Sequence, residues 1–198
     1  MSKMGHILIV GAGPTGSLLA IALANLGLKV TLNDSKPISE LTERSRSYAL
    51  TQSSRLLLEK LELWVPLSEY IHPFNKVRVA DLESKISFDF SASDFIHHFS
   101  DDKHIGWIVD HKDLMKILFS KINSDSLIQC NLGNKFVDDQ IDYDIKLAAD
   151  GSNSSTRKNL NINSYSYKYT QACLTTKVII EGSQNDIAYE LFRHEGPL

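Results

Sequence analysis

The sequence predicts an α/β fold in which a parallel βαβ unit is interrupted by an inserted set of antiparallel strands. A short apolar run, residues 7–10, leads into a glycine-rich turn and a helix-forming stretch, which is the order of a βαβ unit. Residues 85–90 alternate between apolar and polar side chains, as half-buried antiparallel strands do. Residues 145–149 are again a mostly apolar run that ends in Asp-Gly, as expected of a parallel strand with a site at its carboxyl end.

The composition is that of an ordinary globular domain. The 198 residues are 42% hydrophobic and 23% charged, which excludes a disordered or collagen-like chain. Lys and Arg number 21 against 24 Asp and Glu, so no basic surface for nucleic acid is expected. The two cysteines, Cys130 and Cys173, form no metal or disulfide pattern and indicate a reducing compartment such as the cytoplasm.

The N-terminal stretch reads as strand, turn, helix and strand. Ile7–Val10 is a short apolar strand, and the motif Gly11-Ala12-Gly13-Pro14-Thr15-Gly16 follows it directly. A helix is predicted over Ser17–Leu26, ending at Gly27, and a second strand over Lys29–Asn33. This order is the context in which a glycine motif indicates dinucleotide binding. A secretory signal is the alternative, but the helix breakers in the motif interrupt its apolar run.

Each residue of the glycine motif has a physical reason. Gly11 permits a tight turn, and Gly13 lets the backbone approach a pyrophosphate. Gly16 allows the helix to pack closely on the strand, and Pro14 suits the first helical position. Asp34, 18 residues after Gly16, ends the second strand, where a carboxylate can accept a hydrogen bond from a ribose hydroxyl.

The middle of the chain predicts a helix followed by antiparallel strands. Residues 35–47 read as a polar loop, and Thr51–Leu63 as an amphipathic helix that ends near Pro66. Strands are predicted at Lys76–Ala80 and Lys85–Phe90, and a loop over residues 91–106.

The remaining elements return to the parallel pattern and then leave it again. Trp107–Val109 is a short strand or turn, and Asp110 caps a helix over Lys112–Ile122. Ile145–Ala149 is a short parallel strand, and a further strand is predicted over Leu174–Glu181, after alternating tyrosines. The predicted division is a first dinucleotide-binding part, substrate-domain strands, a second dinucleotide-binding part and the start of a substrate-domain sheet: residues 1–72, 73–106, 107–160 and 161–198.

Three motifs in this order resemble the flavin-dependent aromatic hydroxylases of the p-hydroxybenzoate hydroxylase type. They are the glycine motif with Asp34, Arg46-Ser47-Tyr48-Ala49-Leu50, and Ala149-Asp150-Gly151 followed by Ser154, Ser155 and Arg157. Within that group the chain is most similar to the ubiquinone-biosynthesis hydroxylases. The features are the helix ending Leu61-Glu62-Leu63-Trp64, the segment Ile108–Leu118, and Tyr169-x-Gln171-Ala172. The resemblance implies an FAD-binding Rossmann-like domain with an inserted, incomplete substrate sheet.

The resemblance also implies residue roles. Gly11, Gly13 and Gly16, with Pro14 and Thr15 between them, hold the FAD pyrophosphate, and Asp34 binds the adenosine ribose. Family members usually have Glu at that position, so the shorter Asp side chain implies a longer or water-bridged contact. Arg46 approaches the pyrophosphate, with Arg44 as the competing candidate, and Asp150 accepts from a ribityl hydroxyl beside Gly151.

Two departures from the family pattern stand out. The segment Ser126–Asp144 is short beside the β-rich stretch of family members. A further FAD motif, Gly-Asp after a strand, is missing before Leu198, which implies the N-terminal part of a longer enzyme or of a split or truncated gene.

The implied function is an FAD-dependent monooxygenase that uses NAD(P)H and O₂ to hydroxylate a polyprenyl phenol. No catalytic side chain and no metal ligand is nominated, because His97, His98, His104 and His111 lack metal-site spacing and read as solvated loop residues. Implied partners are a small phenolic substrate and no nucleic acid, with a separate C-terminal chain, a biosynthetic complex or peripheral contact with the inner membrane left open. The alternatives are another FAD-dependent oxidoreductase, an NAD-dependent dehydrogenase, or an inert nucleotide-binding remnant.

Overall fold

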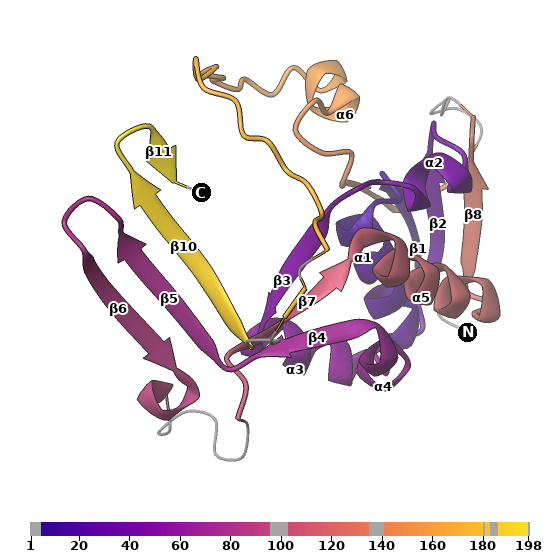
Figure 1. Cartoon of the computed structure of the whole chain (residues 1–198). Helices are drawn as coiled ribbons and strands as arrows, with labels where there is room; N and C mark the ends of the chain where they lie inside the picture. The colour runs from indigo at the N-terminus through magenta and orange to yellow at the C-terminus, as the bar shows by residue number, and fades with distance from the viewer. Residues whose placement is uncertain (1–4, 96–102, 135–140, 180, 183–185, 198) are drawn as a thin grey trace.

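The computed structural model contains three β-sheets, with most of the helices grouped around the first two (Figure 1). It describes residues 5–95, 103–134, 141–179, 181–182 and 186–197. Most strands of the second and third sheets come between two strands of the first sheet in chain order. The predicted α/β class, with a parallel sheet and an insertion, is therefore confirmed.

The first sheet is fully parallel in the order β8-β2-β1-β9. Its strands are β1 (His6–Val10), β2 (Lys29–Asp34), β8 (Ile128–Leu132) and β9 (Ile145–Ala148). Three of the four were predicted, while β8 was not. Polar residues in β8, Gln129 and Asn131, break up its apolar run, which an edge strand tolerates because neither face needs to be fully buried.

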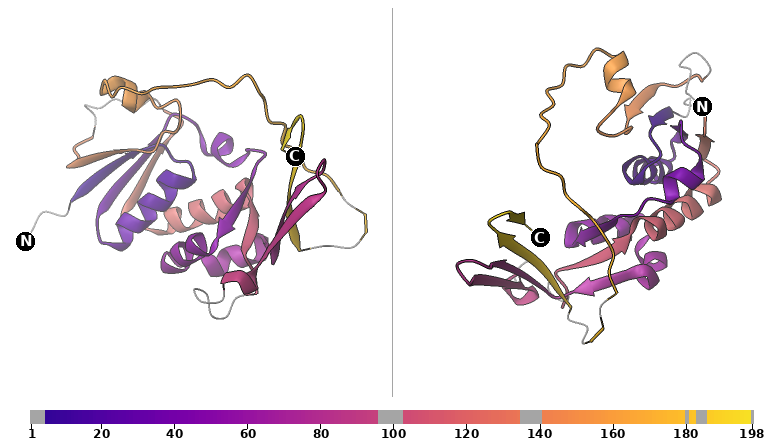
Figure 2. Two further views of the ribbon diagram at one scale, coloured as in Figure 1. Left: turned by 90° about the vertical axis from the view of Figure 1, so that its left-hand side faces the viewer. Right: turned by 45° about the horizontal axis from the view of Figure 1, so that its top comes forward.

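Helix α1 (Pro14–Asn25) packs on this sheet, and helix α5 (His111–Ser124) packs against α1 (Figure 2). The core therefore extends from the apolar strands through α1 to α5, where Leu114 and Leu118 are buried. Burying each such side chain stabilises the fold by about 1.5–3 kcal/mol. Helix α1 ends before Gly27, whose φ of +77° closes the helix as glycine does at this position.

The second sheet is antiparallel in the order β3-β7-β4. Its strands are β3 (Ser47–Thr51), β7 (Gly106–Asp110) and β4 (Ile71–Phe74), of which only β7 was predicted. The predicted loop over residues 35–47 contains helix α2 (Ile38–Thr42), because the buried Leu41 gives that turn an apolar anchor. The helix predicted over residues 51–63 is α3 (Gln52–Lys60), and a separate helix, α4 (Trp64–Leu67), contains Pro66 in its first turn.

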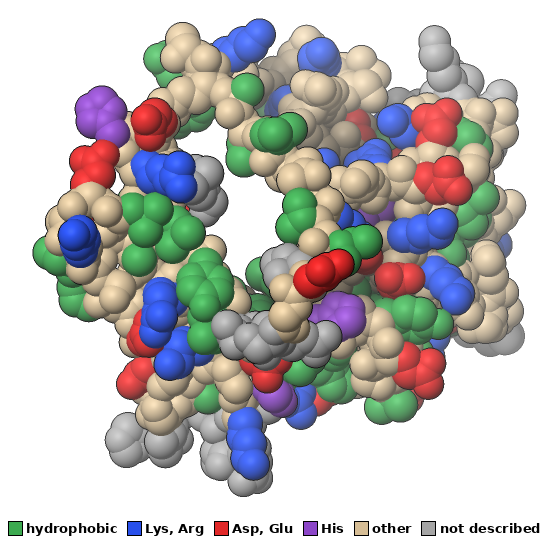
Figure 3. Space-filling model, viewed as in Figure 1, with side chains coloured by type: hydrophobic (Ala, Val, Ile, Leu, Met, Phe, Trp, Pro, Cys, Tyr) green, Lys and Arg blue, Asp and Glu red, His purple; other side chains and the backbone are tan. Residues whose placement is uncertain are grey.

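The third sheet has the order β11-β10-β5-β6. Its strands are β5 (Lys76–Asp81), β6 (Ile86–Ser91), β10 (Ile187–Arg193) and β11 (Gly196–Pro197). The antiparallel pair β5–β6 was predicted, but the prediction that the apolar face of β6 is buried is wrong. Ile86, Phe88 and Phe90 are 54%, 65% and 46% exposed, and apolar side chains gather over this sheet in Figure 3.

The strand predicted over Leu174–Glu181 is wrong in the described residues. Residues 163–179 run as an extended segment without strand pairing, seen in Figure 1 between α6 (Ser155–Asn159) and β10. The three tyrosines that alternate in this segment, Tyr165, Tyr167 and Tyr169, are 92%, 67% and 76% exposed. A β-strand sequence needs a neighbouring strand to satisfy its N–H and C=O groups, and the described chain offers this segment none.

The described residues contain no helix that is long and apolar enough to cross a membrane. In the same residues no three His, Cys, Asp or Glu side chains gather in a way that could hold a metal ion.

Candidate functional site

The glycine loop between β1 and α1 lies at the carboxyl edge of the parallel sheet. Its first residue, Gly11, has a φ of +106° and donates its N–H to the carbonyl oxygen of Asn33 at 2.7 Å. A Cβ atom on Gly11 would lie 2.3 Å from the carbonyl oxygen of Ala149, and one on Gly16 would lie 1.8 Å from that of Gly11. Close packing within the chain therefore accounts for both of these glycines.

Gly13 is different, because a Cβ atom there would meet no atom within 4 Å. It is the N-cap of α1, no side chain caps this end of the helix, and Pro14 follows in the first turn beside the exposed Thr15. The end of the helix thus combines a partial positive charge with open space against the backbone. This arrangement fits the pyrophosphate of a dinucleotide such as FAD.

Asp34 ends β2 beside this loop, and its carboxylate is already held by backbone groups. Oδ2 accepts the N–H of Ala12 at 2.8 Å, and Oδ1 accepts the N–H of Lys36 at 2.9 Å. Each carboxylate oxygen can accept a second hydrogen bond, so a ribose hydroxyl remains compatible with this geometry. The hydrogen bond from Ala12 also shows that Asp34 holds the glycine loop in place, a role that sequence reasoning missed.

Asn33 is a further residue at this edge that sequence reasoning missed. Its side chain is 1% exposed, and its Oδ1 has no hydrogen-bond partner in the part of the chain that the structure describes. Buried polar atoms normally have a partner, so an orphaned oxygen next to the glycine loop is consistent with a bound polar group or water there. A polar residue in an otherwise apolar strand was the available signal.

The arginine segment, which we define as residues 41–48, runs from the end of α2 to the start of β3 and brings Arg44 and Arg46 to the surface. The N–H of Arg46 donates to the carbonyl oxygen of Arg44 at 3.0 Å, which turns the chain tightly between them. Both side chains are exposed, and within the described residues neither guanidinium has a hydrogen bond or ion pair. The geometry does not choose between the two, so Arg46 stays a prediction and Arg44 its rival.

The second acidic site residue, Asp150, follows β9 and is engaged within its own turn. Its Oδ1 accepts the Ser154 hydroxyl at 2.5 Å, and its Oδ2 accepts the N–H of Thr156 at 3.0 Å. Burial raises the pKa of Asp150, but the hydrogen bonds from Ser154 and Thr156 outweigh burial and hold the pKa below its ordinary value. The carboxylate is thus kept ionised and oriented, and Gly151, with a φ of +84°, turns the chain after it.

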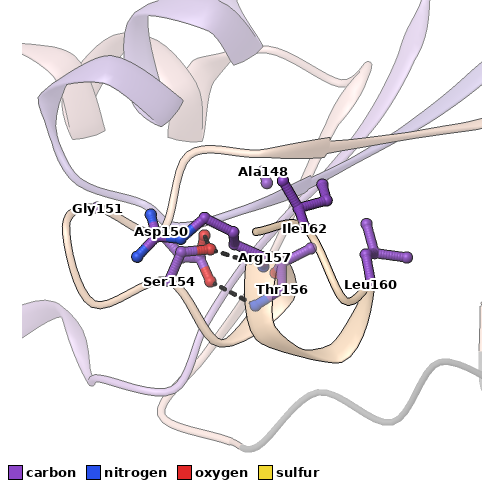
Figure 4. Close-up of a pocket in the computed structure, with 8 residues that line it drawn as sticks. All are labelled: Ala148, Asp150, Gly151, Ser154, Thr156, Arg157, Leu160 and Ile162. Carbon is purple, nitrogen blue, oxygen red and sulfur yellow. Dashed lines mark hydrogen bonds between the residues drawn. The ribbon is translucent and has the colours of Figure 1, made fainter. Parts of the chain in front are cut away.

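A pocket of about 270 Å³ lies beside this turn (Figure 4). Its lining is Ala148, Asp150, Gly151, Ser154, Thr156, Arg157, Leu160 and Ile162. Arg157 donates from Nη2 to the carbonyl oxygen of Ser152 at 2.6 Å, while its buried Nε has no partner in the described residues. The glycine loop touches the same turn, because a Cβ on Gly11 would lie 2.7 Å from the Asp150 nitrogen. The two predicted FAD motifs therefore meet at one edge of the sheet.

The histidines do not behave as the sequence suggested. His111 is 1% exposed and begins α5, so the prediction of a solvated loop residue is wrong. His104 is partly buried, while His97 and His98 lie outside the described residues. Asp110 occupies the N-cap position of α5 but its side chain caps nothing there, since it accepts the Ser47 hydroxyl at 2.6 Å and pairs with Lys177.

Comparison with known proteins agrees with the resemblance of the motifs. The model of the FAD binding domain family matches residues 4–80. Ubiquinone hydroxylase UbiM of Neisseria meningitidis is 29% identical, across 98% of this chain and 46% of its own length. The 3-demethoxyubiquinol 3-hydroxylase of Escherichia coli is 23% identical, across 97% and 53%. The chain spans about half the length of the curated relatives it matches.

Solved structures show the same fold. The tetrameric form of 2-methyl-3-hydroxypyridine-5-carboxylic acid oxygenase is 15% identical, and the match covers 96% of this chain and 53% of that one with a TM-score of 0.70. PqsL from Pseudomonas aeruginosa is 17% identical, and the match covers 84% and 48% with a TM-score of 0.63. At these identities the likeness concerns the fold alone, and it confirms the Rossmann-like α/β architecture, while the match to the FAD binding domain model supplies the link to FAD.

Proposed function

We propose, from the premise that this chain belongs to the FAD-dependent monooxygenase family, that it forms the FAD-binding part of an enzyme that hydroxylates a polyprenylated phenol. The substrate class follows from two relatives, ubiquinone hydroxylase UbiM and 3-demethoxyubiquinol 3-hydroxylase. The physiological reductant in this proposal is NADH or NADPH, and O₂ is the oxygen donor.

The free space at Gly13 is the observation that supports FAD binding most directly. Packing within the chain requires glycine at positions 11 and 16, yet no neighbouring atom requires it at position 13. A pyrophosphate lying against the backbone gives that position a reason to be glycine. The uncapped N-terminus of α1 offers N–H donors and a partial positive charge to the same group.

The remaining roles are assigned to the residues around this loop. Asp34 accepts hydrogen bonds from the adenosine ribose while it holds the glycine loop, and Arg46 neutralises pyrophosphate charge with its planar fork of donors. The ionised Asp150 accepts a hydrogen bond from a ribityl hydroxyl, and Gly151 lets the chain pass close beside it. When bound, FAD supplies electron transfer from the nicotinamide and activation of O₂, so the protein contributes binding, orientation and exclusion of water.

Two further parts of the proposal concern the chain's surroundings. A polyprenyl tail partitions into lipid, so we place the enzyme in the cytoplasm at the surface of the inner membrane. Since the chain spans about half the length of its curated relatives, we propose that the rest of the active site comes from further polypeptide, either a separate chain or a continuation of this one.

Calorimetric titration of the purified chain with FAD, NAD and NADP tests the proposal. We expect FAD to bind most tightly, and Gly13→Val to weaken it at least tenfold by filling the space at the backbone. Asn25→Val, at the exposed far end of α1, is the matched control and should leave FAD affinity unchanged. A preference for NAD, or equal FAD affinity in the Gly13→Val variant, would contradict the proposal.

A further inference from the structure

Apart from bonds within α5, the described residues give His111 three hydrogen bonds, and all three go to the arginine segment. Its backbone N–H donates to the carbonyl oxygen of Arg46 at 2.9 Å. Its Nε2 lies 2.7 Å from the carbonyl oxygen of Leu41, and its Nδ1 lies 2.7 Å from the hydroxyl of Tyr48. The contacts thus reach both ends of the segment and one residue between them.

The partners fix the tautomer of the ring. A carbonyl oxygen can only accept, so Nε2 carries a hydrogen and donates to Leu41. The Tyr48 hydroxyl can then donate to Nδ1, which leaves every polar atom of the ring satisfied. The side chain is 1% exposed. A ring with both nitrogens engaged and no access to solvent cannot serve as a general base for a substrate, so its role must be exerted through the groups that it holds.

Two of the residues bonded to His111, Leu41 and Tyr48, flank Arg44 and Arg46 along the chain. Leu41 is buried at the start of the segment, and Tyr48 lies in β3 at its end. The neighbouring Asp110 adds a fourth tie, since it accepts the Ser47 hydroxyl at 2.6 Å. The arginine side chains themselves are exposed and lack partners among the described residues, so the main chain is what sets the positions from which they extend.

We propose that His111 is a positioning residue that fixes the arginine segment and thereby holds Arg46 ready for the FAD pyrophosphate. We call the hydrogen bonds from His111 to Leu41, Arg46 and Tyr48 the clamp. The clamp is seen in the structure, whereas the role of Arg46 rests on the proposed function. Holding the segment still before binding reduces the entropy that an exposed arginine loses when it binds an anion. A buried histidine that only filled space would not need two ring hydrogen bonds that both go to this one segment.

The clamp is tested in the chain without cofactor by limited digestion with trypsin, because the segment contains two cleavage sites. Cleavage after Arg44 and Arg46, identified by mass spectrometry, should be at least several-fold faster in His111→Phe than in the parent chain. Ile122→Val, buried at the other end of the same helix, is the matched control and should not change cleavage at these two sites. Unchanged cleavage in His111→Phe would overturn the clamp.

The link to FAD is tested by a double-mutant cycle with Arg46→Ala. His111→Phe should weaken FAD binding about tenfold, equivalent to roughly 1.4 kcal/mol, and should have less than a twofold effect when Arg46 is already alanine. His111→Gln, whose amide can still donate to Leu41, should recover part of the affinity. Fully additive effects would overturn the positioning role.

Two outcomes keep this inference separate from the proposed function. If Arg46→Ala leaves FAD affinity unchanged, the assignment of Arg46 fails and the positioning role fails with it, while the trypsin result still decides whether the clamp exists. If His111→Phe does not fold, Tyr48→Phe removes only the hydrogen bond to Nδ1 and should show the same faster cleavage and the same coupling to Arg46, on a smaller scale. No change in Tyr48→Phe would then count against the clamp.

Discussion

The first and third sheets contain similar apolar strands but treat them in opposite ways. In the first sheet, Leu8, Ile9 and Leu32 are completely buried. In the third sheet, the apolar side chains of β6, Ile86, Phe88 and Phe90, remain about half exposed or more. The difference is the second layer: α1 packs on the first sheet, whereas the helix with a substantial contact to β6 is the short 3₁₀-helix Ala92–Phe95 that directly follows it. Strand sequence alone therefore does not determine burial, because burial requires an element that covers the strand.

The same contrast separates the two halves of the proposed function. All of the candidate FAD-binding residues belong to the first sheet, its loops and the arginine segment, which share the buried core. None comes from the third sheet, whose strands lie in the segments predicted to form the substrate domain. Nucleotide binding is thus expected of the first sheet with its loops and helices. Oxygen transfer to a substrate also needs a water-excluding enclosure, which the third sheet does not supply by itself.

The largest expected effect is complete absence of hydroxylation by these 198 residues alone. With FAD, NADPH and a simple polyprenyl phenol, oxidation of NADPH should be absent or should yield peroxide, because the exposed third sheet cannot keep water from the reactive flavin. Mass spectrometry of the phenol and a peroxide assay measure both outcomes. Hydroxylated product in stoichiometric amount would contradict this division of roles, since these residues would then suffice for oxygen transfer as well as for FAD binding.

The second prediction compares equivalent truncations in the two sheets. Leu32→Ala should lower the free energy of unfolding by about 2–5 kcal/mol, because it leaves a cavity in a closely packed core. Phe88→Ala, at a side chain 65% exposed, should lower it by less than about 1 kcal/mol. Urea unfolding followed by circular dichroism measures both. Similar losses in the two variants would show that the third sheet is covered in solution.

Sequence reasoning succeeded where a strong local pattern met a local fold. Ile7–Val10, the glycine motif and the following helix need only their neighbours in sequence to form, and the structure places each of them as expected. The strand β9 and the turn at Asp150 were found for the same reason, because an apolar run and an Asp-Gly turn are both local signals.

The failures concern elements that depend on distant partners. Strand β3 is stabilised by pairing with β7, about 60 residues further on, and β10 pairs with β5 across more than 100 residues. Leu174–Glu181 fails for the opposite reason, since it has the sequence of a strand but finds no strand to pair with among the described residues. The three contacts of His111 were equally invisible, because they join positions 63 to 70 residues apart.

The third prediction concerns Arg46, on the exposed arginine segment. Arg46→Ala should weaken FAD binding by about 1–3 kcal/mol, the range for a hydrogen bond to a charged group. Arg46→Lys should recover only part of this, because an ammonium group lacks the planar fork. Arg44→Ala is the matched control in fluorescence titrations, and a larger loss there would move the pyrophosphate contact to Arg44.

The smallest expected effect is a pH dependence in the third sheet. The hydrogen bond from Arg78 lowers the pKa of Asp89 to about 2, with Lys76 contributing in the same direction. Arg78 donates from Nε and Nη2 to the two carboxylate oxygens at 2.6 and 2.7 Å, which joins β5 to β6. Because the pKa is lower in the folded chain than in the unfolded one, this pair stabilises the sheet above about pH 4 and loses its effect as the pH falls towards 2.

Asp89→Asn isolates that contribution from the other carboxylates. Asp150 in the first region also has a lowered pKa, so acid destabilises both regions and the parent chain alone cannot separate them. The difference in unfolding midpoint between the parent and Asp89→Asn should be greatest above pH 4, shrink towards zero near pH 2, and shrink in 1 M salt because the pair is exposed. Amide exchange in β5 and β6 at pH 5 should be faster in the variant, with β1 and β2 unchanged. A constant difference at all pH values would mean that the Arg78–Asp89 pair does not join the two strands through its charge.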